Sequence, residues 1–405
     1  MKHPIAFAAL ACVLLVPAIA RADDWPMFRG PSRDGISAET GWRSTWPATP
    51  KTMWKASVGE GFSSITVKSG RVYTLGNADG KDTVWCLDAE SGKPVWKHEY
   101  AAPRMGEVKP DYPGPRATPT VDGGVVYTVS RDGQAFCLDA ASGKVKWAVN
   151  LIKDHGIGLP SWGFSSSPLV HGKMLIFNAN AGGAAIDKEN GKLIWKSADG
   201  EGSYDTPAVF EQGGRQRLAM FNATEAVCTD AATGEILWRI PWKTSWKTHA
   251  ADKIVHDGKM FISSAYNFGC ALLDVKAIPP KEIWRNKEMK NHFSTSVLYK
   301  GHLYGIDGNV ERGAVLKCIE FATGTPKWEA EEFGFGSLML ADGKLIILTG
   351  SGALVIAEAT PEKHKELARA QVLGGRCWTS PVLANGRIYC RNEAGDLVCV
   401  DVKGE

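Results

Sequence analysis

The sequence predicts an all-β fold, an eight-bladed β-propeller of four-stranded antiparallel blades. Three observations predict it. Tryptophan recurs at intervals of 42 to 51 residues, each interval reads as four short strands joined by glycine turns, and the last interval lacks a fourth strand that the start of the chain can supply. Repeated units of this length and strand content are typical of propellers. The recurring residues are Trp54, Trp96, Trp147, Trp195, Trp238, Trp284 and Trp328.

One unit shows the strand pattern most clearly. Between Thr118 and Val149, β-branched and aromatic residues gather in four runs, and each of the three intervals between them contains glycine. The glycines stand where tight hairpin loops require positive φ, and the runs have the composition of strands. The expected strands cover residues 118–121, 125–130, 134–139 and 144–149.

The two ends of the chain predict how the ring closes. Residues 378–405 supply three strands and stop before any tryptophan, whereas residues 49–58 form an isolated strand that carries Trp54. We therefore expect the N-terminal strand to join the last blade, which leaves few free sheet edges. The expected organisation is a signal peptide over residues 1–22, an N-terminal extension over 23–48 that packs on the propeller, and a single propeller domain over 49–405.

The first 22 residues predict export. Lys2 and His3 precede an apolar run, and Ala20-Arg21-Ala22 fits a small-x-small cleavage site, so we expect cleavage after Ala22 and a periplasmic or extracellular protein. No second apolar run of about 20 residues follows, so no transmembrane segment is expected. The formal net charge of +3 provides no one-sign field for nucleic acid. We expect a monomer.

The repeated tryptophan is interpreted as structural. The stretch from Cys86 to Trp96 returns almost unchanged from Cys137 to Trp147. An indole on the outermost strand would pack against the neighbouring blade and over a glycine turn, burying about 150–250 Å², and the acidic residue two after the cysteine would accept hydrogen bonds from turn N–H groups. Cysteines at this repeated position are expected to be small buried residues. A bridge among Cys270, Cys377 and Cys390 stays open.

The pattern A-x-D-x-x-[TS]-G-K-x-x-W, with Cys often replacing Ala, resembles the tryptophan-docking motif of the pyrroloquinoline-quinone (PQQ) propeller superfamily. It recurs at Ala185–Trp195 and Cys228–Trp238. That superfamily includes the quinoprotein alcohol dehydrogenases and the propeller lipoprotein of the bacterial outer-membrane assembly machinery. The segment DWPMFRGPSRDGIS also looks like exported bacterial PQQ-like repeat proteins. The resemblance covers nearly the whole mature chain and implies the propeller, but a shared fold does not assign a function.

The resemblance leaves two functions open. The first is a non-catalytic binding or scaffold protein of the cell envelope, with an envelope protein or a small ligand as its partner. The alternative is a PQQ-dependent alcohol dehydrogenase with PQQ and calcium as cofactors. That family stacks its quinone on a pair of adjacent cysteines, and this chain has no such pair and no C-x-x-C-H haem site. We therefore favour binding, and the sequence predicts no catalytic residue, no cofactor and no metal site.

A binding site is expected on the face that carries the connections from the fourth strand (d) of one blade to the first strand (a) of the next. Long loops on a rigid frame concentrate binding groups, and aromatic residues beside cations suit an anionic or sugar-like ligand or an acidic protein edge. Arg116 and Arg376 are favoured because each stands at or just before a first strand, where side chains can face the channel. The candidates are Arg104, Tyr112, Arg116, His155, Trp162, Lys243, Trp246, His249, His292 and Arg376.

Overall fold

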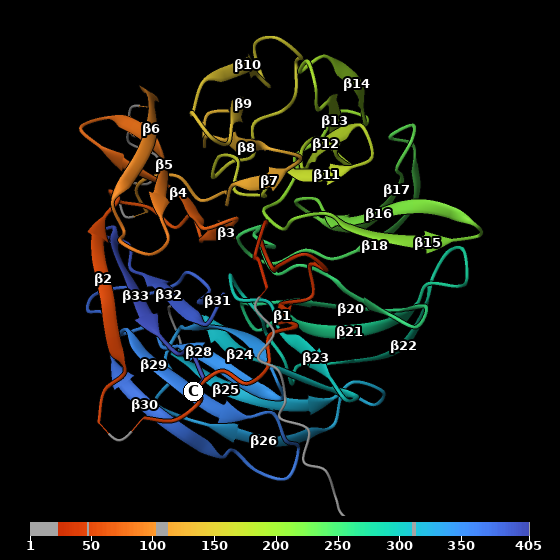
Figure 1. Cartoon of the computed structure of the whole chain (residues 1–405). Coiled ribbons are helices and arrows are strands. Elements are labelled where there is room, and N and C mark those ends of the chain that lie inside the picture. Colours follow the sequence, from red (N-terminus) through yellow and green to blue (C-terminus); the bar gives the residue numbers. More distant parts are fainter. Residues whose placement is uncertain (1–22, 47, 103–111, 310–312, 405) are drawn as a thin grey trace, which may run out of the picture.

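Eight antiparallel sheets are arranged around a central channel, as Figure 1 shows. The computed structural model describes residues 23–46, 48–102, 112–309 and 313–404, so the expected signal peptide lies outside the described residues. The predicted eight-bladed fold of four-stranded blades is confirmed. Among the described residues, no helix is long and apolar enough to cross a membrane.

Blades 1 to 3 each contain four consecutive strands, which follow in order from the channel outwards. Blade 1 contains β3 (Thr66–Lys68), β4 (Arg71–Ala78), β5 (Lys81–Asp88) and β6 (Pro94–Ala101). Blade 2 contains β7 (Thr120–Asp122), β8 (Val125–Val129), β9 (Gln134–Asp139) and β10 (Val145–Asn150). Blade 3 contains β11 (Leu169–His171), β12 (Met174–Phe177), β13 (Ala184–Asp187) and β14 (Leu193–Lys196).

Blades 4 to 6 repeat this order. Blade 4 contains β15 (Ala208–Gln212), β16 (Arg215–Phe221), β17 (Glu225–Asp230) and β18 (Ile236–Pro241). Blade 5 contains β19 (Ile254–His256), β20 (Lys259–Ser264), β21 (Gly269–Asp274) and β22 (Lys281–Asn286). Blade 6 contains β23 (Val297–Tyr299), β24 (His302–Asn309), β25 (Gly313–Glu320) and β26 (Pro326–Ala330).

The last two blades each include a strand from the N-terminal part of the chain. Blade 7 contains β27 (Ser337–Ala341), β28 (Lys344–Leu348), β29 (Ala353–Glu358) and β30 (Glu366–Gln371), and β1 (Ile36–Ser37) pairs parallel with β27. Blade 8 contains β31 (Val382–Ala384), β32 (Arg387–Arg391) and β33 (Asp396–Asp401). Its outer strand is β2 (Lys51–Ser57), which pairs antiparallel with β33 and places Trp54 opposite Cys399.

At most blade junctions, the indole of one blade packs on the glycine turn of the next blade. Trp54 Nε1 donates to Ala89 O at 3.0 Å, and a Cβ on Gly92 would lie 2.5 Å from that indole. The same hydrogen bond is made by Trp96, Trp147, Trp195 and Trp284 at 2.9 to 3.2 Å. Only glycine fits beneath the ring, and these tryptophans lie between blades, where the sequence analysis expects them.

Two junctions use a different donor. Trp238 Nε1 is buried without a hydrogen-bond partner in the described part of the chain, and the equivalent carbonyl, Val275 O, accepts from Gln212 Nε2 at 2.5 Å. Where Ala368 replaces tryptophan in blade 7, Arg43 N donates to Val402 O at 2.7 Å. The missing indole hydrogen bond is therefore replaced by a side-chain amide in one place and by the backbone of the N-terminal extension in the other.

The cysteines and turn carboxylates also follow the sequence analysis. All eight cysteines in the described residues are free and buried, so no bridge forms among Cys270, Cys377 and Cys390. Asp88 Oδ1 accepts from the N–H groups of Glu90 and Ser91 at 3.1 and 3.0 Å. Burial in an apolar core raises the pKa of the cysteine thiols, as for Cys137, whose pKa is about 11. The thiols are therefore inert packing groups.

A belt of hydrogen bonds joins the blades around the channel. Each blade carries a hydroxyl or carboxylate just before or at the start of its first strand, and this side chain forms a hydrogen bond with the preceding blade. These bonds fix the spacing of the innermost strands. The donors and acceptors are Ser64 N to Thr118 Oγ1, Thr118 N to Ser167 Oγ, Ser167 N to Thr206 Oγ1, Thr206 N to Asp252 Oδ1 and Asp252 N to Thr295 Oγ1, all within 2.8 to 3.2 Å. Hydroxyl contacts of Ser337 with Ser294 and Ser380, and of Ser64 with Ser380 O, continue the belt.

The N-terminal extension crosses the centre of the ring, where Figure 1 shows it in red. It contacts first strands of blades 1, 2, 3 and 7, through a bridge between Trp25 and Val67 and through β1. Arg29 is buried, and its Nη2 donates to Asp34 O at 2.8 Å and to Ser296 O at 3.1 Å. Its Nε lies 3.9 Å from Asp252 Oδ2, so the extension supplies a counter-charge to the carboxylate in the belt.

Candidate functional site

A cavity of about 320 Å³ lies at the mouth of the channel, in front of the belt. Among the described residues, its walls combine nine aromatic side chains and eight hydroxyl side chains with a single arginine, and they contain no carboxylate. Phe28 of the N-terminal extension also lines it. In an antiparallel blade of four strands, the fourth strand ends on the same face of the ring as the first strand begins. The d-to-a loops therefore lie at this end of the channel. We call this cavity the mouth cavity.

The aromatic wall of the mouth cavity crosses the junction between the first and last blades. Trp378, from the loop before β31, stacks on Phe62, from the loop before β3, with ring centroids 5.5 Å apart. Trp378 also contacts Tyr112 at 5.8 Å and Phe293 at 5.5 Å, and Tyr112 meets Trp162 edge-on at 5.9 Å. The flat surfaces therefore come from blades far apart in sequence.

Arg116 is the cation of the mouth cavity. Its Nη1 donates to Trp162 O at 2.5 Å and its Nη2 to Tyr112 O at 3.2 Å. Burial, together with nearby Arg131, lowers the pKa of the Arg116 guanidinium to about 9, so it remains charged at neutral pH. No carboxylate among the described residues forms an ion pair with Arg116.

His292 also lines the cavity, but as a neutral group. Its ring stacks on Phe293 with centroids 3.8 Å apart, and its Nε2 lies 2.8 Å from Tyr266 Oη. Burial lowers the pKa of His292 to about 3, so the imidazole is uncharged at neutral pH. Its Nδ1 is buried and has no partner in the described residues.

The structure thus brings together half of the candidates from the sequence. Tyr112, Arg116, Trp162, Trp246 and His292 all line the mouth cavity. Trp246 stands at its rim and is 57% exposed. Arg376 lies beside the cavity and does not line it. Its guanidinium is 4.7 Å from the centroid of the Trp378 ring and forms an ion pair with Glu393 at 3.0 Å.

Three other candidates, His155, Lys243 and His249, do not line the cavity. His155 Nε2 lies 2.8 Å from Gly191 O in the turn of the next blade, which is a structural contact. Lys243 is exposed to solvent on the loop that carries Trp246. His249 is buried below the mouth, and Arg104 lies outside the described residues.

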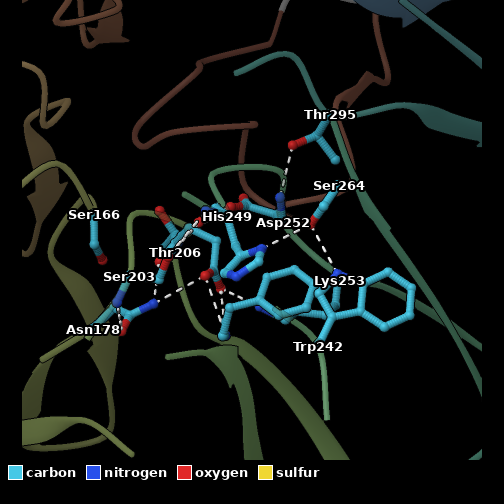
Figure 2. A network of polar contacts seen from close by, with 12 residues as sticks. Ser166, Asn178, Ser203, Thr206, Trp242, His249, Asp252, Lys253, Ser264 and Thr295 are labelled. Carbon is cyan, nitrogen blue, oxygen red and sulfur yellow. Dashed lines mark hydrogen bonds and ion pairs between the residues drawn. The ribbon is translucent and has the colours of Figure 1, made fainter. Parts of the chain in front are cut away.

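His249 belongs to a buried polar network, shown in Figure 2, that supports the loop after β18. Its Nδ1 lies 2.9 Å from Ser264 Oγ, which also accepts from Trp242 Nε1 at 2.9 Å. Burial and the charge of Lys253 lower the pKa of His249 to about 3. Lys253 forms an ion pair with Asp205, and both side chains are completely buried. This network supports the frame of the channel, and of the residues labelled in Figure 2 only Thr206 also lines the mouth cavity.

Sequence reasoning missed several lining residues, although a signal for them exists. The aromatic residues stand two positions before a belt hydroxyl, as in Phe62 and Ser64, Tyr204 and Thr206, Phe293 and Thr295, and Trp378 and Ser380. The belt hydroxyl stands just before each first strand, at the end of the channel. The aromatic residue two positions earlier in the chain therefore lies at the channel mouth. Phe28 carries no such signal, because its place depends on how the extension crosses the ring.

The model of the family described as outer membrane protein assembly factor BamB matches residues 36–202, 104–330 and 222–405, which together span nearly the whole chain. The chain belongs to the BamB family. Among relatives, the BamB of Escherichia coli is 24% identical over 76% of this chain and 88% of its own length, and that of Yersinia pestis is 22% identical over 76% and 77%.

Solved structures share the fold of this BamB-family chain. BamB from Moraxella catarrhalis superposes with a TM-score of 0.65 at 15% identity, covering 87% of this chain and all of that one. The quinohemoprotein alcohol dehydrogenase of Comamonas testosteroni superposes with a TM-score of 0.68 at 13% identity, covering 94% of this chain and 81% of that one. At such identities the likeness shows the propeller alone.

The residues of the mouth cavity do not fit a calcium-bound quinone. Calcium takes six to eight oxygen ligands, with carboxylates prominent among them, and the described part of the lining contains no carboxylate. Among the described residues, no group of three or more His, Cys, Asp or Glu side chains could hold a metal ion.

Proposed function

We propose that this chain is an exported, non-catalytic binding propeller of the bacterial envelope that docks a protein partner on its d-to-a loop face. Membership of a family described as an outer-membrane assembly factor carries the proposal. The loop face adds a chemical argument, because it presents the exposed indole of Trp246 between the exposed cations Lys243 and Lys247. Aromatic anchors beside cations suit a protein partner with an acidic edge.

Site-specific photo-crosslinking tests the docking face. We expect a photoreactive benzoylphenylalanine in place of Trp246 to crosslink to a protein of the outer-membrane assembly machinery, identified by mass spectrometry, in bacteria that export the chain. Ile278 provides a matched control, because it is 59% exposed, against 57% for Trp246, and lies in a c-to-d turn on the opposite face. Crosslinks at residue 278 but not at 246, or none at either, would reject this assignment.

A further inference from the structure

We propose that the mouth cavity binds a small aromatic carboxylate, a flat ring that carries one anionic group. The proposal goes beyond protein docking, because the occupant sits inside the cavity and Trp246 of the docking face only forms part of its rim. It concerns a second class of ligand, so the two proposals can fail separately.

The positive charge of Arg116 indicates that the ligand is an anion. Arg116 uses two of the five N–H donors of a guanidinium on the carbonyls of Trp162 and Tyr112. Arg131 donates to the same Tyr112 carbonyl at 3.2 Å, so two cations converge there. A partly buried guanidinium without an anion in the cavity is an unfavourable arrangement that an anionic ligand would relieve. Three N–H groups of Arg116 remain, and a carboxylate is an anion that a guanidinium can bind through two parallel hydrogen bonds.

The shape and the apolar character of the walls indicate that the ligand contains a flat ring. The rings of Trp162, Tyr112, Trp378 and Phe293 follow one another along the wall, and Phe28 adds another ring to the lining. Aromatic rings prefer to meet other rings in offset or edge-on contact. The volume of about 320 Å³ is at the lower end of small-molecule sites. One flat ring system fits these walls.

The hydrogen-bonding capacity of the lining argues against a sugar acid. Thr118, Ser167 and Thr206 already accept belt amides, and the lining contributed by the described residues contains no Asn, Gln, Asp or Glu. A sugar presents hydroxyls on every side, and each buried hydroxyl without a partner destabilises the complex. All eight serine and threonine hydroxyls of the lining already have a hydrogen-bond partner among the described residues. Within the same residues, Tyr112 Oη has no hydrogen bond and Tyr204 Oη only accepts from Trp162 N, so two phenol groups besides Arg116 stay open to a ligand, fewer than a sugar acid would need.

Calorimetric titration of the purified full chain tests the proposal with three probes: 2-naphthoate, its neutral analogue 2-naphthamide, and D-glucuronate. We expect one 2-naphthoate per chain, bound about 10- to 100-fold more tightly than either of the others, because the charge-assisted contact with Arg116 is absent from the amide and the ring is absent from the sugar acid. Equal binding of acid and amide, tighter binding of glucuronate, or no binding of 2-naphthoate would overturn the proposal.

Variants locate the effect. R116M is expected to weaken 2-naphthoate about 10- to 100-fold while leaving 2-naphthamide unchanged, and R239M, which removes an exposed arginine on an outer strand, is expected to change neither. Unchanged 2-naphthoate affinity in R116M would reject Arg116 as the anion partner. If R116M does not fold, the comparison of acid and amide on the unaltered chain still decides, and it does so whatever the crosslinking at residue 246 shows.

Discussion

At the scale of single residues, burial is the main reason why the two histidines near the channel are neutral, and the charge of Lys253 adds to it for His249. His292 touches Phe293 and Phe335, and His249 lies 4.9 Å from the ring of Phe221. Both sites disfavour the imidazolium ion because they offer it little water. The sequence placed both histidines on long loops but could not show that they face aromatic rings, because those rings come from other segments.

Acid is therefore expected to destabilise the propeller through these histidines. The unfolded chain binds a proton near pH 6.5, whereas the pKa of folded His292 and that of folded His249 are each about 3. Between these values the unfolded state binds more protons, so the free energy of unfolding falls as the pH falls, by about 1.4 kcal/mol per pH unit for each histidine. We predict that the fall in the free energy of unfolding between pH 6.5 and pH 4.5, measured with urea, is smaller in H292F, by about half of the part that the two histidines contribute. The control H256F, which replaces an exposed histidine, is expected to show the same fall as the unaltered chain. Equal slopes in H292F and the unaltered chain would contradict the assignment.

At the scale of elements, the turn between the third and fourth strands joins the blades because its glycine lies beneath the indole of the preceding blade. The repeat in the sequence predicted this turn, its acidic cap and its tryptophan, since all three fall within eleven consecutive residues. The same reasoning could not predict Gln212 or Arg43 as replacement donors. Those contacts join residues 63 and 359 positions apart in the sequence, and only the closed ring brings them together.

Substitutions at two glycines distinguish the cost of an unfavourable backbone conformation from the cost of lost packing. Gly234 has φ +76° and a Cβ there would lie 2.4 Å from the Trp195 ring, whereas Gly70 has φ +72° and a Cβ there would meet no atom within 4 Å. Both G234A and G70A place alanine at positive φ, which costs about 1–2 kcal/mol. We predict that G234A loses at least about 1 kcal/mol more, because it also displaces an interblade indole, as measured by denaturant unfolding. Equal losses would mean that the indole contact adds nothing.

At the scale of the whole molecule, the N-terminal part of the chain organises both the channel and its mouth. The extension crosses the channel, pairs with blade 7 through β1, and continues into β2 of blade 8. The sequence predicted the strand in the last blade from a count of strands. It could not predict that Phe28 reaches the mouth cavity or that Arg29 faces Asp252, because neither residue belongs to a repeat.

The charge on Arg29 is expected to matter for stability. The side chain of Asp252 is 9% exposed, and this burial raises the pKa of its carboxyl, whereas Arg29 is the largest influence that lowers that pKa. R29M would leave that carboxylate without its nearest arginine, and removal of one partner of a buried pair typically costs about 3–5 kcal/mol. We predict a loss of this order in R29M, partly recovered in the double variant R29M/D252N, from thermal and denaturant unfolding. A double variant no more stable than R29M would show that the lost contacts are those with backbone carbonyls instead.

The mouth cavity exists only if the ring closes, because Phe62 and Trp378 meet across the junction of the first and last blades. The most direct measurement is an engineered disulfide between β2 and β33, where Ser57 and Asp396 are exposed and directly opposite. We predict that S57C/D396C forms an intramolecular disulfide, seen by mass spectrometry under non-reducing conditions, and unfolds at a higher temperature than its reduced form. The control K51C/D396C, with cysteines at opposite ends of the same strands, is expected to keep free thiols. Free thiols or intermolecular dimers in S57C/D396C would contradict ring closure and the site that depends on it.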